Sequence, residues 1–294
     1  MRTPTRIAAF AATLGAVFGA AALAGAGLDP VRDPARGGGA DMAAGHSGGH
    51  GSAVIDPTAA DRLGAAGLAV ADGGYRLVAE ATSLPRGEAT RVAFRILDPR
   101  GVAVTGFDVE HERKMHLIVV RRDLTGYQHL HPTLDAHGRW RVTLRLPEAG
   151  VYRAYADFGT GGRSMTLATD LFVAGPFRPS ALPDVTAVDT TAGYRAELSA
   201  PNATAGADAE ISYDLSRGGR PLTDIEPYLG ADGHLVALRE GDLAFLHVHP
   251  EESATPGRIR FGASLPSAGR YRLFLQFRHD GRVRTVAHTL EVSG

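Results

Sequence analysis

The sequence contains no cysteine. Disulfide bonds, thiolate zinc sites, iron–sulfur clusters, cysteine nucleophiles and blue-copper centres all require that side chain, so each of them is excluded. Any metal ion that this protein binds must therefore be held by His, Met, Asp or Glu. The 12 histidines of the chain are the leading candidates for metal ligands.

An excess of positive charge is also lacking. The chain has 31 Lys and Arg against 32 Asp and Glu, a formal net charge of -1 at pH 7. Proteins that bind nucleic acid neutralise phosphates with a basic surplus, so we expect no nucleic-acid partner. The sequence has no G-x-S-x-G elbow, phosphate-binding loop, dinucleotide fingerprint or H-E-x-x-H helix. We expect that the protein is not an enzyme, although a three-histidine metal site with oxidase or hydrolase activity stays open.

A positively charged start and a long uncharged run open the sequence. Arg2 and Arg6 precede 21 uncharged residues, 7–27, that are rich in Ala, Leu, Val and Phe. Two A-x-A patterns near the end of this run fit a signal peptidase site, while its length is also sufficient to span a bilayer. We expect residues 1–27 to be a signal peptide or an uncleaved N-terminal membrane anchor. Either alternative makes the protein exported, extracellular or part of the cell envelope.

Residues 28–73 have the composition of a flexible linker. Glycine runs and little apolar bulk argue against regular structure over most of this stretch. A short helix is expected after Asp56, which is a suitable N-cap before a proline. The linker also carries Met42, His46 and His50. These side chains either bind metal or are incidental parts of a spacer.

Internal repetition is the main feature of the remaining sequence. The Gly-Tyr-Arg motif at 74–76 and the Ala-Gly-x-Tyr-Arg motif at 149–153 both recur 119 residues later. Two histidine motifs recur after 118 residues. One residue fewer in this part of the second copy explains the difference between the two spacings. Two copies of one domain of about 100 residues are therefore predicted. The predicted segments are repeat 1 at 74–174, a proline-containing linker at 175–192, and repeat 2 at 193–294.

Each repeat is predicted to consist of β-strands. Apolar and polar residues alternate over 139–146 and over 258–265, which is the period of a strand with one face in a core. About seven or eight such strands per repeat indicate an all-β fold of two tandem immunoglobulin-like β-sandwiches. Tyr152 and Tyr271 are expected to form tyrosine corners, in which the hydroxyl bonds to backbone upstream. Trp140 is expected to be a core residue.

Six histidines form a duplicated set. They are His116, His129 and His131 in repeat 1, and His234, His247 and His249 in repeat 2. The last two of each set are two residues apart on an extended segment, so both point to one face. We predict an antiparallel hairpin, with Glu240-Gly241 as its tight turn in repeat 2, that places the first histidine directly opposite the second. Three imidazoles would then share one face in each repeat, unless a one-residue shift moves the first to the other face.

Three neutral imidazoles suit Cu(II) or Zn(II) and leave a coordination position open. His111 and Met115 are expected to add donors in repeat 1, where Glu110 or Glu112 could complete the set. Repeat 1 is therefore the better candidate, with copper as the expected metal and zinc as the other possibility. The alternative is a structural role, in which the imidazoles form hydrogen bonds with loop carbonyls. Duplication of the domain would preserve such hydrogen bonds as readily as metal ligands.

The histidine motifs and their surroundings resemble a family of exported bacterial proteins that are often labelled as secreted or heavy-metal-binding. The residues that carry the resemblance are 109–120 (VEHERKMHLIVV), Asp123-Leu124 and 129–132 (HLHP), with 228–230 (YLG), Asp242-Leu243 and 247–250 (HVHP) in the second copy. The resemblance covers most of 74–293. It implies an exported tandem β-sandwich with a link to copper or other heavy metals, and the six motif histidines are the positions that match.

Two hypotheses for function follow. The first is an exported metal-binding protein that buffers or delivers copper, or else zinc, through its histidines. Because the imidazoles must be neutral to bind, affinity would fall below about pH 6. The second is an extracytoplasmic interaction or adhesion module with a protein partner, in which the histidine motifs are structural. In both hypotheses the protein contacts a membrane only through an uncleaved N-terminal segment.

Overall fold

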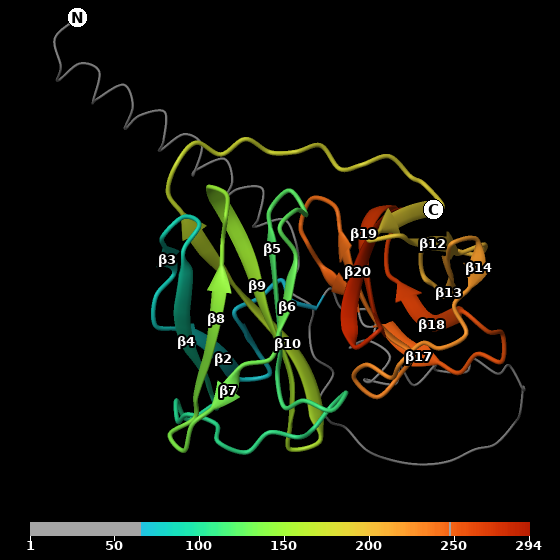
Figure 1. The fold of residues 1–294 in the computed structure, drawn as a ribbon. Helices are drawn as coiled ribbons and strands as arrows, with labels where there is room; N and C mark the ends of the chain where they lie inside the picture. Colours follow the sequence, from blue (N-terminus) through green and yellow to red (C-terminus); the bar gives the residue numbers. More distant parts are fainter. Residues whose placement is uncertain (1–65, 247) are drawn as a thin grey trace, which may run out of the picture. The chain divides into compact units, whose positions relative to one another are not determined.

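The computed structural model describes residues 66–246 and 248–294, which form two successive β-sandwiches (Figure 1). The predicted fold class, two tandem immunoglobulin-like β-sandwiches, is confirmed. No helix within these residues is long and apolar enough to cross a bilayer. The N-terminal segment at 1–27, the linker donors Met42, His46 and His50, the helix expected after Asp56, and His247 all lie outside the described residues.

Repeat 1 contains ten strands in two sheets. The strands are β1 (Ala71–Asp72), β2 (Tyr75–Ala79), β3 (Ser83–Leu84), β4 (Ala89–Leu97), β5 (His116–Arg121), β6 (Gln128–Leu130), β7 (Thr133–Leu134), β8 (Arg139–Arg145), β9 (Gly150–Thr160) and β10 (Arg163–Val173). One sheet has the order β1-β2-β4-β8-β7 and the other β3-β10-β9-β5-β6. All pairs are antiparallel except β3 with β10.

Repeat 2 has the same arrangement. Its strands are β11 (Val188–Thr191), β12 (Tyr194–Ser199), β13 (Ala207–Arg217), β14 (Arg220–Pro221), β15 (Gly233–Arg239), β16 (Phe245–Leu246), β17 (Val248–Glu251), β18 (Arg258–Leu265), β19 (Gly269–His279) and β20 (Arg282–Val292). One sheet runs β11-β12-β13-β18-β17, with β14 paired to β13, and the other runs β16-β15-β19-β20.

Both repeats begin earlier than the sequence motifs suggested. β1 lies inside the expected linker at 28–73, and β11 lies inside the one at 175–192. The Gly-Tyr-Arg motif starts in the turn of a hairpin rather than at the edge of a domain. The turn residues Gly73 and Gly74 have φ of 53° and 84°, and Ala192 and Gly193 have φ of 48° and 84°. Positive φ at both positions is the geometry of a two-residue hairpin turn, which glycine favours.

Alternation along the strands builds a separate core in each sandwich. In β18 every second residue is buried, and the buried side chains join those of β13 and β19 in the core of repeat 2. Trp140 on β8 is 2% exposed and packs edge-on against Phe107 in the core of repeat 1, with ring centroids 4.9 Å apart. The expectation for this tryptophan is confirmed.

A third apolar cluster lies between the repeats. All six residues of β5 are buried, because Leu117 and Val119 face the core of repeat 1 whereas Ile118 and Val120 face repeat 2. On β15, Val236 and Leu238 face repeat 1 in the same way. The two repeats lie within one compact unit. Their equivalent strands β5 and β15 therefore each have one face in their own sandwich and one face in the shared cluster.

The contacts in this shared cluster are reciprocal. The ring of Tyr127 stacks on Phe274 with centroids 4.1 Å apart, and the ring of Tyr155 lies 5.5 Å from Phe245. Phe245 is the repeat 2 equivalent of Tyr127, and Phe274 is the equivalent of Tyr155. The Tyr155 hydroxyl also donates to the Leu243 carbonyl at 2.6 Å. Such exchange of equivalent partners is what a two-fold relation between the repeats produces.

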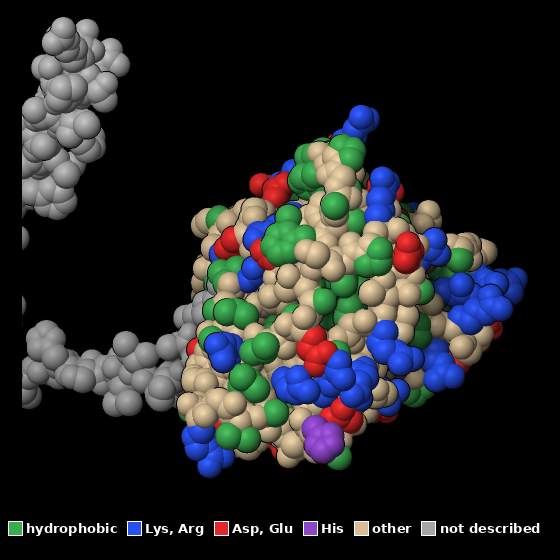
Figure 2. Space-filling view, turned by 90° about the vertical axis from the view of Figure 1, so that its left-hand side faces the viewer, with side chains coloured by type: hydrophobic (Ala, Val, Ile, Leu, Met, Phe, Trp, Pro, Cys, Tyr) green, Lys and Arg blue, Asp and Glu red, His purple; other side chains and the backbone are tan. Residues whose placement is uncertain are grey.

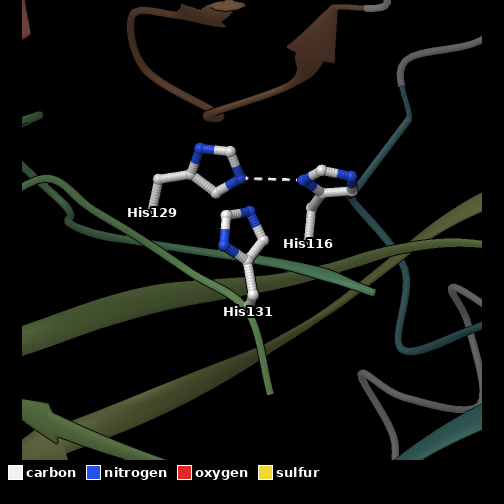
Figure 3. Close-up of side chains that lie close together, drawn as sticks. All are labelled: His116, His129 and His131. Atoms are coloured by element: carbon white, nitrogen blue, oxygen red, sulfur yellow. Dashed lines mark hydrogen bonds between the residues drawn. The ribbon is translucent and has the colours of Figure 1, made fainter. Parts of the chain in front are cut away.

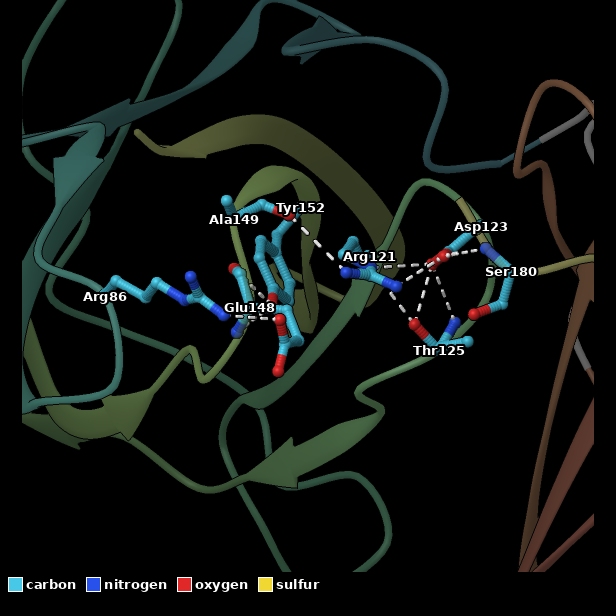
Figure 4. Close-up of polar contacts among 8 residues, drawn as sticks. All are labelled: Arg86, Arg121, Asp123, Thr125, Glu148, Ala149, Tyr152 and Ser180. Atoms are coloured by element: carbon cyan, nitrogen blue, oxygen red, sulfur yellow. Dashed lines mark hydrogen bonds and ion pairs between the residues drawn. The ribbon is translucent and has the colours of Figure 1, made fainter. Parts of the chain in front are cut away.

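The predicted tyrosine corners are confirmed in both repeats. The Tyr152 hydroxyl donates to the Glu148 carbonyl at 2.9 Å (Figure 4), and the Tyr271 hydroxyl donates to the Ser267 carbonyl at 2.8 Å. Beside the first corner, Arg121 binds both carboxylate oxygens of Asp123. The bond closes the loop after β5, and Asp123 in turn accepts from the Ser180 amide of the connecting segment.

Replacing Tyr271 by Phe is expected to lower the free energy of unfolding by about 1–2 kcal/mol, because the Ser267 carbonyl loses its buried donor. Tyr213→Phe is the matched control. Its hydroxyl is also buried but has no hydrogen-bond partner among the described residues, so the loss should be near zero. Urea denaturation of both variants measures the difference, and equal losses would contradict a stabilising corner.

Candidate metal centre

Three histidines of repeat 1 converge at the end of β5 that lies beside β6. His116 is the first residue of β5, His129 lies in β6, and His131 follows β6 before the chain crosses to the other sheet. Their rings point towards one another (Figure 3), and one ring nitrogen from each lies within 4.8 Å of the other two. Ligand nitrogens around one tetrahedral ion lie about 3.3 Å apart, so only a small adjustment would bring all three onto an ion.

The hairpin register differs from the predicted one. The structure pairs Ile118 with His129 and Leu117 with Leu130, so His116 does not lie directly opposite His129. In repeat 2, Ala237 pairs with Leu246. Both registers are displaced from the prediction by two residues, because the loop is longer than a tight turn and contains a residue with positive φ, Leu124 or Leu243. A displacement by two keeps each side chain on its face, so the three imidazoles of repeat 1 still come together.

An outer hydrogen bond sets the tautomer of His116, and another orients the ring of His129. His116 Nε2 lies 3.1 Å from the Glu110 carbonyl oxygen, which can only accept, so Nε2 carries the proton. His129 Nδ1 lies 2.7 Å from Gln276 Oε1, while the amide nitrogen of Gln276 donates to Thr285. With the amide oxygen of Gln276 facing the ring, His129 Nδ1 carries the proton of a neutral imidazole. Both inner nitrogens therefore present lone pairs.

The inner nitrogens of His116 and His129 lie within hydrogen-bond distance of each other (Figure 3). His116 Nδ1 lies 2.9 Å from His129 Nε2. His131 Nε2 is buried nearby and has no hydrogen-bond partner in the described part of the chain. Buried polar atoms are normally satisfied, and metal-binding histidines typically donate their outer N–H to a carbonyl or a similar acceptor. A cation at the centre would satisfy all three inner nitrogens at once.

Burial keeps these imidazoles neutral. It lowers the pKa of His129 to about 3, with the neighbouring His116 acting in the same direction, and it lowers the pKa of His131 to about 4. Burial also lowers the pKa of His116. Neutral imidazole is the form that binds a metal ion, so protons compete less for this site than for exposed histidines.

Two further predicted residues lie at the edge of the cluster. The ring of His234, from β15 of repeat 2, stacks near His129 and His116 with centroids 4.7 Å and 5.6 Å apart. Burial holds its pKa well below the ordinary value. The exposed His111 lies 6.1 Å from the ring of His116 and 6.0 Å from that of His234. His234 is the equivalent of His116, so the repeats meet where the two equivalent histidines stack.

The predicted residues Met115 and His249 lie elsewhere. Met115 is 1% exposed in the core of repeat 1, because it precedes His116 on the chain and points to the opposite side. His249 is exposed on β17, in the sheet that does not contain β15. Strand β17 begins at Val248, whereas the equivalent strand β7 begins only after His131. In repeat 2 the earlier strand therefore places His249 in the other sheet of the sandwich from His234.

Sequence reasoning missed two residues of this centre. Gln276 orients His129 from across the repeat boundary. Asp157 lies opposite His116 in the β5–β9 pairing, and its carboxylate accepts from Thr166 at 2.7 Å. Gln276 and Asp157 are equivalent positions, 119 residues apart. The 119-residue spacing could have paired them, but only the packing of the repeats shows that Gln276 reaches His129.

Comparisons with known proteins agree with the tandem arrangement. A family model described as "Domain of unknown function (DUF8832)" matches residues 69–175 and again 187–294. No curated protein matches the sequence. The twofold match confirms the repeats, while its description carries no link to heavy metals.

Three solved structures illustrate the structural similarity. The Escherichia coli adhesin FdeC covers 77% of this chain at 16% identity with a TM-score of 0.26, and the Yersinia pseudotuberculosis adhesin InvE covers 74% at 12% with 0.24. The matches span 66% and 59% of those two chains. A DUF4426 family protein from Pseudomonas aeruginosa PAO1 covers 36% of this chain and 93% of its own at 9% identity, with 0.30. All three TM-scores lie below 0.5, so these similarities carry no functional argument.

Proposed function

We propose that this chain, which belongs to the DUF8832 family of domains of unknown function, binds one copper or zinc ion through His116, His129 and His131. The observation that carries the proposal is the set of three inner nitrogens. Two of them lie 2.9 Å apart, and the third is buried without a hydrogen-bond partner among the described residues.

The donor set favours borderline metals. Imidazole nitrogen suits Cu(II) and Zn(II), whereas Mg²⁺ and Ca²⁺ prefer oxygen ligands. Three protein ligands leave a fourth position for water, for an exchanging ligand or for a second donor such as His111. An open position on a preformed scaffold suits an exported protein that buffers or delivers a metal ion. The depressed pKa values extend binding to lower pH than ordinary histidines would allow.

Metal titration of the full chain tests the proposal. Isothermal titration with Cu(II) and with Zn(II) at pH 7 should show one saturable site, and saturating metal should raise the melting temperature. The variant His116→Ala/His129→Ala/His131→Ala should lose both effects. Binding that survives in this variant, or an absence of saturable binding by the unaltered chain, would overturn the proposal.

Gln276→Leu supplies a finer test of the same site. It leaves the three ligands in place but removes the acceptor that orients His129, so metal affinity should fall by about 10–100-fold. Thr255→Val serves as its matched control, because it replaces an exposed polar residue of the same repeat away from the centre. Unchanged affinity in Gln276→Leu would show that the orientation of His129 does not matter for binding.

The second candidate is an extracytoplasmic interaction module. The hydrogen bond from His129 to Gln276 crosses from repeat 1 to repeat 2, and it favours a structural role in which the histidines hold the two sandwiches together. In that case the triple alanine variant changes the stability of the chain, while the unaltered chain binds no metal. The expectation that the protein is exported depends on the pattern of residues 1–27. N-terminal sequencing of the secreted protein tests whether this segment is cleaved.

A further inference from the structure

Arginines cover the outer face of one sheet of repeat 1. Six arginines of β2, β4 and β8 point away from the core, and we term them the arginine face: Arg76, Arg91, Arg95, Arg139, Arg141 and Arg145. The buried neighbours in between, such as Phe94 and Trp140, point to the core. Figure 2 views the molecule from the side on which β4 and β8 are drawn in Figure 1, and blue side chains gather over its lower and right-hand parts.

Some of this positive charge is not balanced. Glu80 pairs with Arg95 and with Arg139, and Asp135 pairs with Arg141. Arg91 and Arg145 have no ion-pair partner among residues 66–246 and 248–294. Furthermore, Arg95 and Arg139 lie directly opposite each other on paired strands. Like charges so placed destabilise a sheet, but Glu80 accepts from both of these arginines. The uncompensated charge of the face therefore includes that of Arg91 and Arg145.

Repeat 2 shows how the same face looks when it is balanced. The β13–β18 pairing places Asp214 opposite Arg258, at the positions that Arg95 and Arg139 occupy in β4 and β8. Asp214 accepts from Arg258 at 2.7 Å. The repeat 2 residues at the positions of Ala89, Arg91 and Arg145 are Asp208, Glu210 and Ser264. The fold therefore accommodates an acid at two positions, Glu210 and Asp214, where repeat 1 has Arg91 and Arg95.

The chemistry of the arginine face selects among anionic partners. Its outward positions on β2, β4 and β8 carry no aromatic side chain, although stacking on aromatic rings is how nucleic-acid bases are usually held. Protein interfaces are centred on aromatic and large apolar side chains, whereas this face has no aromatic residue and Val78 is its one exposed large hydrophobic residue on β2, β4 and β8. A sheet face with fixed positive charges can bind a dense anionic surface through electrostatic attraction alone. Clustered basic residues bind anionic lipids through this attraction.

A shallow hollow within this face offers a place for a headgroup. It has a volume of about 450 Å³, and its lining residues are Arg91, His131, Thr133, Arg141, Val142 and Thr143. Guanidinium and hydroxyl donors are the groups that commonly hold a phosphate oxygen. We infer that the arginine face docks on an anionic phospholipid surface, with a lipid phosphate between Arg91 and Arg141. This contact is separate from any N-terminal anchor.

Vesicle co-sedimentation of the full chain tests this inference. The probe is a vesicle of equimolar phosphatidylglycerol and phosphatidylcholine, with pure phosphatidylcholine as the neutral control. The variant Arg91→Glu/Arg145→Ser introduces the residues of repeat 2 and breaks no ion pair of the described residues. It should weaken binding to the anionic vesicles by at least about tenfold. Binding by the unaltered chain should also weaken as salt is added.

The matched control is Arg220→Glu/Arg282→Ser, which makes the same change in net charge at exposed positions of repeat 2. It should bind like the unaltered chain. Equal losses of binding in both variants would show that only the net charge of the chain matters, and would overturn the inference. The inference would also be overturned if the unaltered chain did not bind anionic vesicles. Arg91→Gln/Arg145→Gln provides the same test if the acidic variant does not fold. Acidic protein or polysaccharide bound in preference to vesicles would replace the lipid as partner.

Discussion

Lowering the pH from 7 to 5 in the absence of metal is expected to reduce the free energy of unfolding by about 3–4 kcal/mol through His129 and His131 alone. In the folded chain their pKa values are about 3 and about 4, mainly because of burial. In the unfolded chain both return to about 6.5, so the unfolded state binds more protons below that pH. The stabilisation is complete above pH 6.5 and is lost as the pH falls towards the folded-state values.

Other groups act in the same direction or lie outside this window. Burial also lowers the pKa of His116 and of His234, which adds to the acid sensitivity. Carboxylates such as Asp123, with a pKa of about 2, lose their contribution mostly below pH 5. The interval from pH 7 to pH 5 therefore reports chiefly on buried histidines.

Urea denaturation at several pH values between 7 and 5 measures this effect. His129→Gln should be less stable than the unaltered chain at pH 7 but should show a shallower dependence on pH, because one titrating group is gone. His137→Gln is the matched control, since His137 is exposed in the turn before β8. Parallel curves for all three proteins would contradict a neutral buried cluster.

A charge placed between the repeats should have an effect of similar size. Ile118→Asp is expected to lower the free energy of unfolding by about 3–5 kcal/mol, because Ile118 is fully buried in the shared cluster and an unpaired carboxylate there loses its hydration. Val102→Asp is the control: Val102 is 55% exposed, so the change should be within about 0.5 kcal/mol.

The position of Ile118 makes a second outcome visible. Its side chain faces repeat 2, while its neighbours Leu117 and Val119 remain in the core of repeat 1. The substitution should therefore separate the unfolding of the two sandwiches, and calorimetry should show two transitions in place of one. If Ile118→Asp behaved like Val102→Asp, the packing of β5 against β15 would not hold in solution.

The repeat architecture could be predicted from the sequence because its signals are local. Alternation along β8 and β18, and the tyrosine motifs that end in Tyr152 and Tyr271, depend on neighbouring residues and recur at one spacing. The strand of each hairpin that carries the first histidine was also correctly placed. Its register was wrong by two residues, because the length of the loop before His129 is set by the backbone conformation of Leu124 and not by a tight turn.

The composition of the metal centre was only partly accessible from the sequence. Convergence of His116, His129 and His131 was predicted, since an even displacement of register leaves side chains on their face. The sequence pattern predicted that His234 and His249 belong to a second three-histidine metal site in repeat 2. In the structure, His234 stacks on the cluster of repeat 1 and His249 lies exposed on β17.

Three features follow from the order of the amino acids: any metal is bound without cysteine, two β-sandwiches follow one another, and three histidines of repeat 1 share a face. The packing of the repeats through β5 and β15, and the bond by which Gln276 orients His129, emerge only when the chain is folded. The same holds for the single surface that the arginines of β4 and β8 form. The difference lies in the distance along the chain over which the interactions act. Alternation and turns act between near neighbours in the chain, whereas contacts between residues more than 100 positions apart depend on how whole sheets meet.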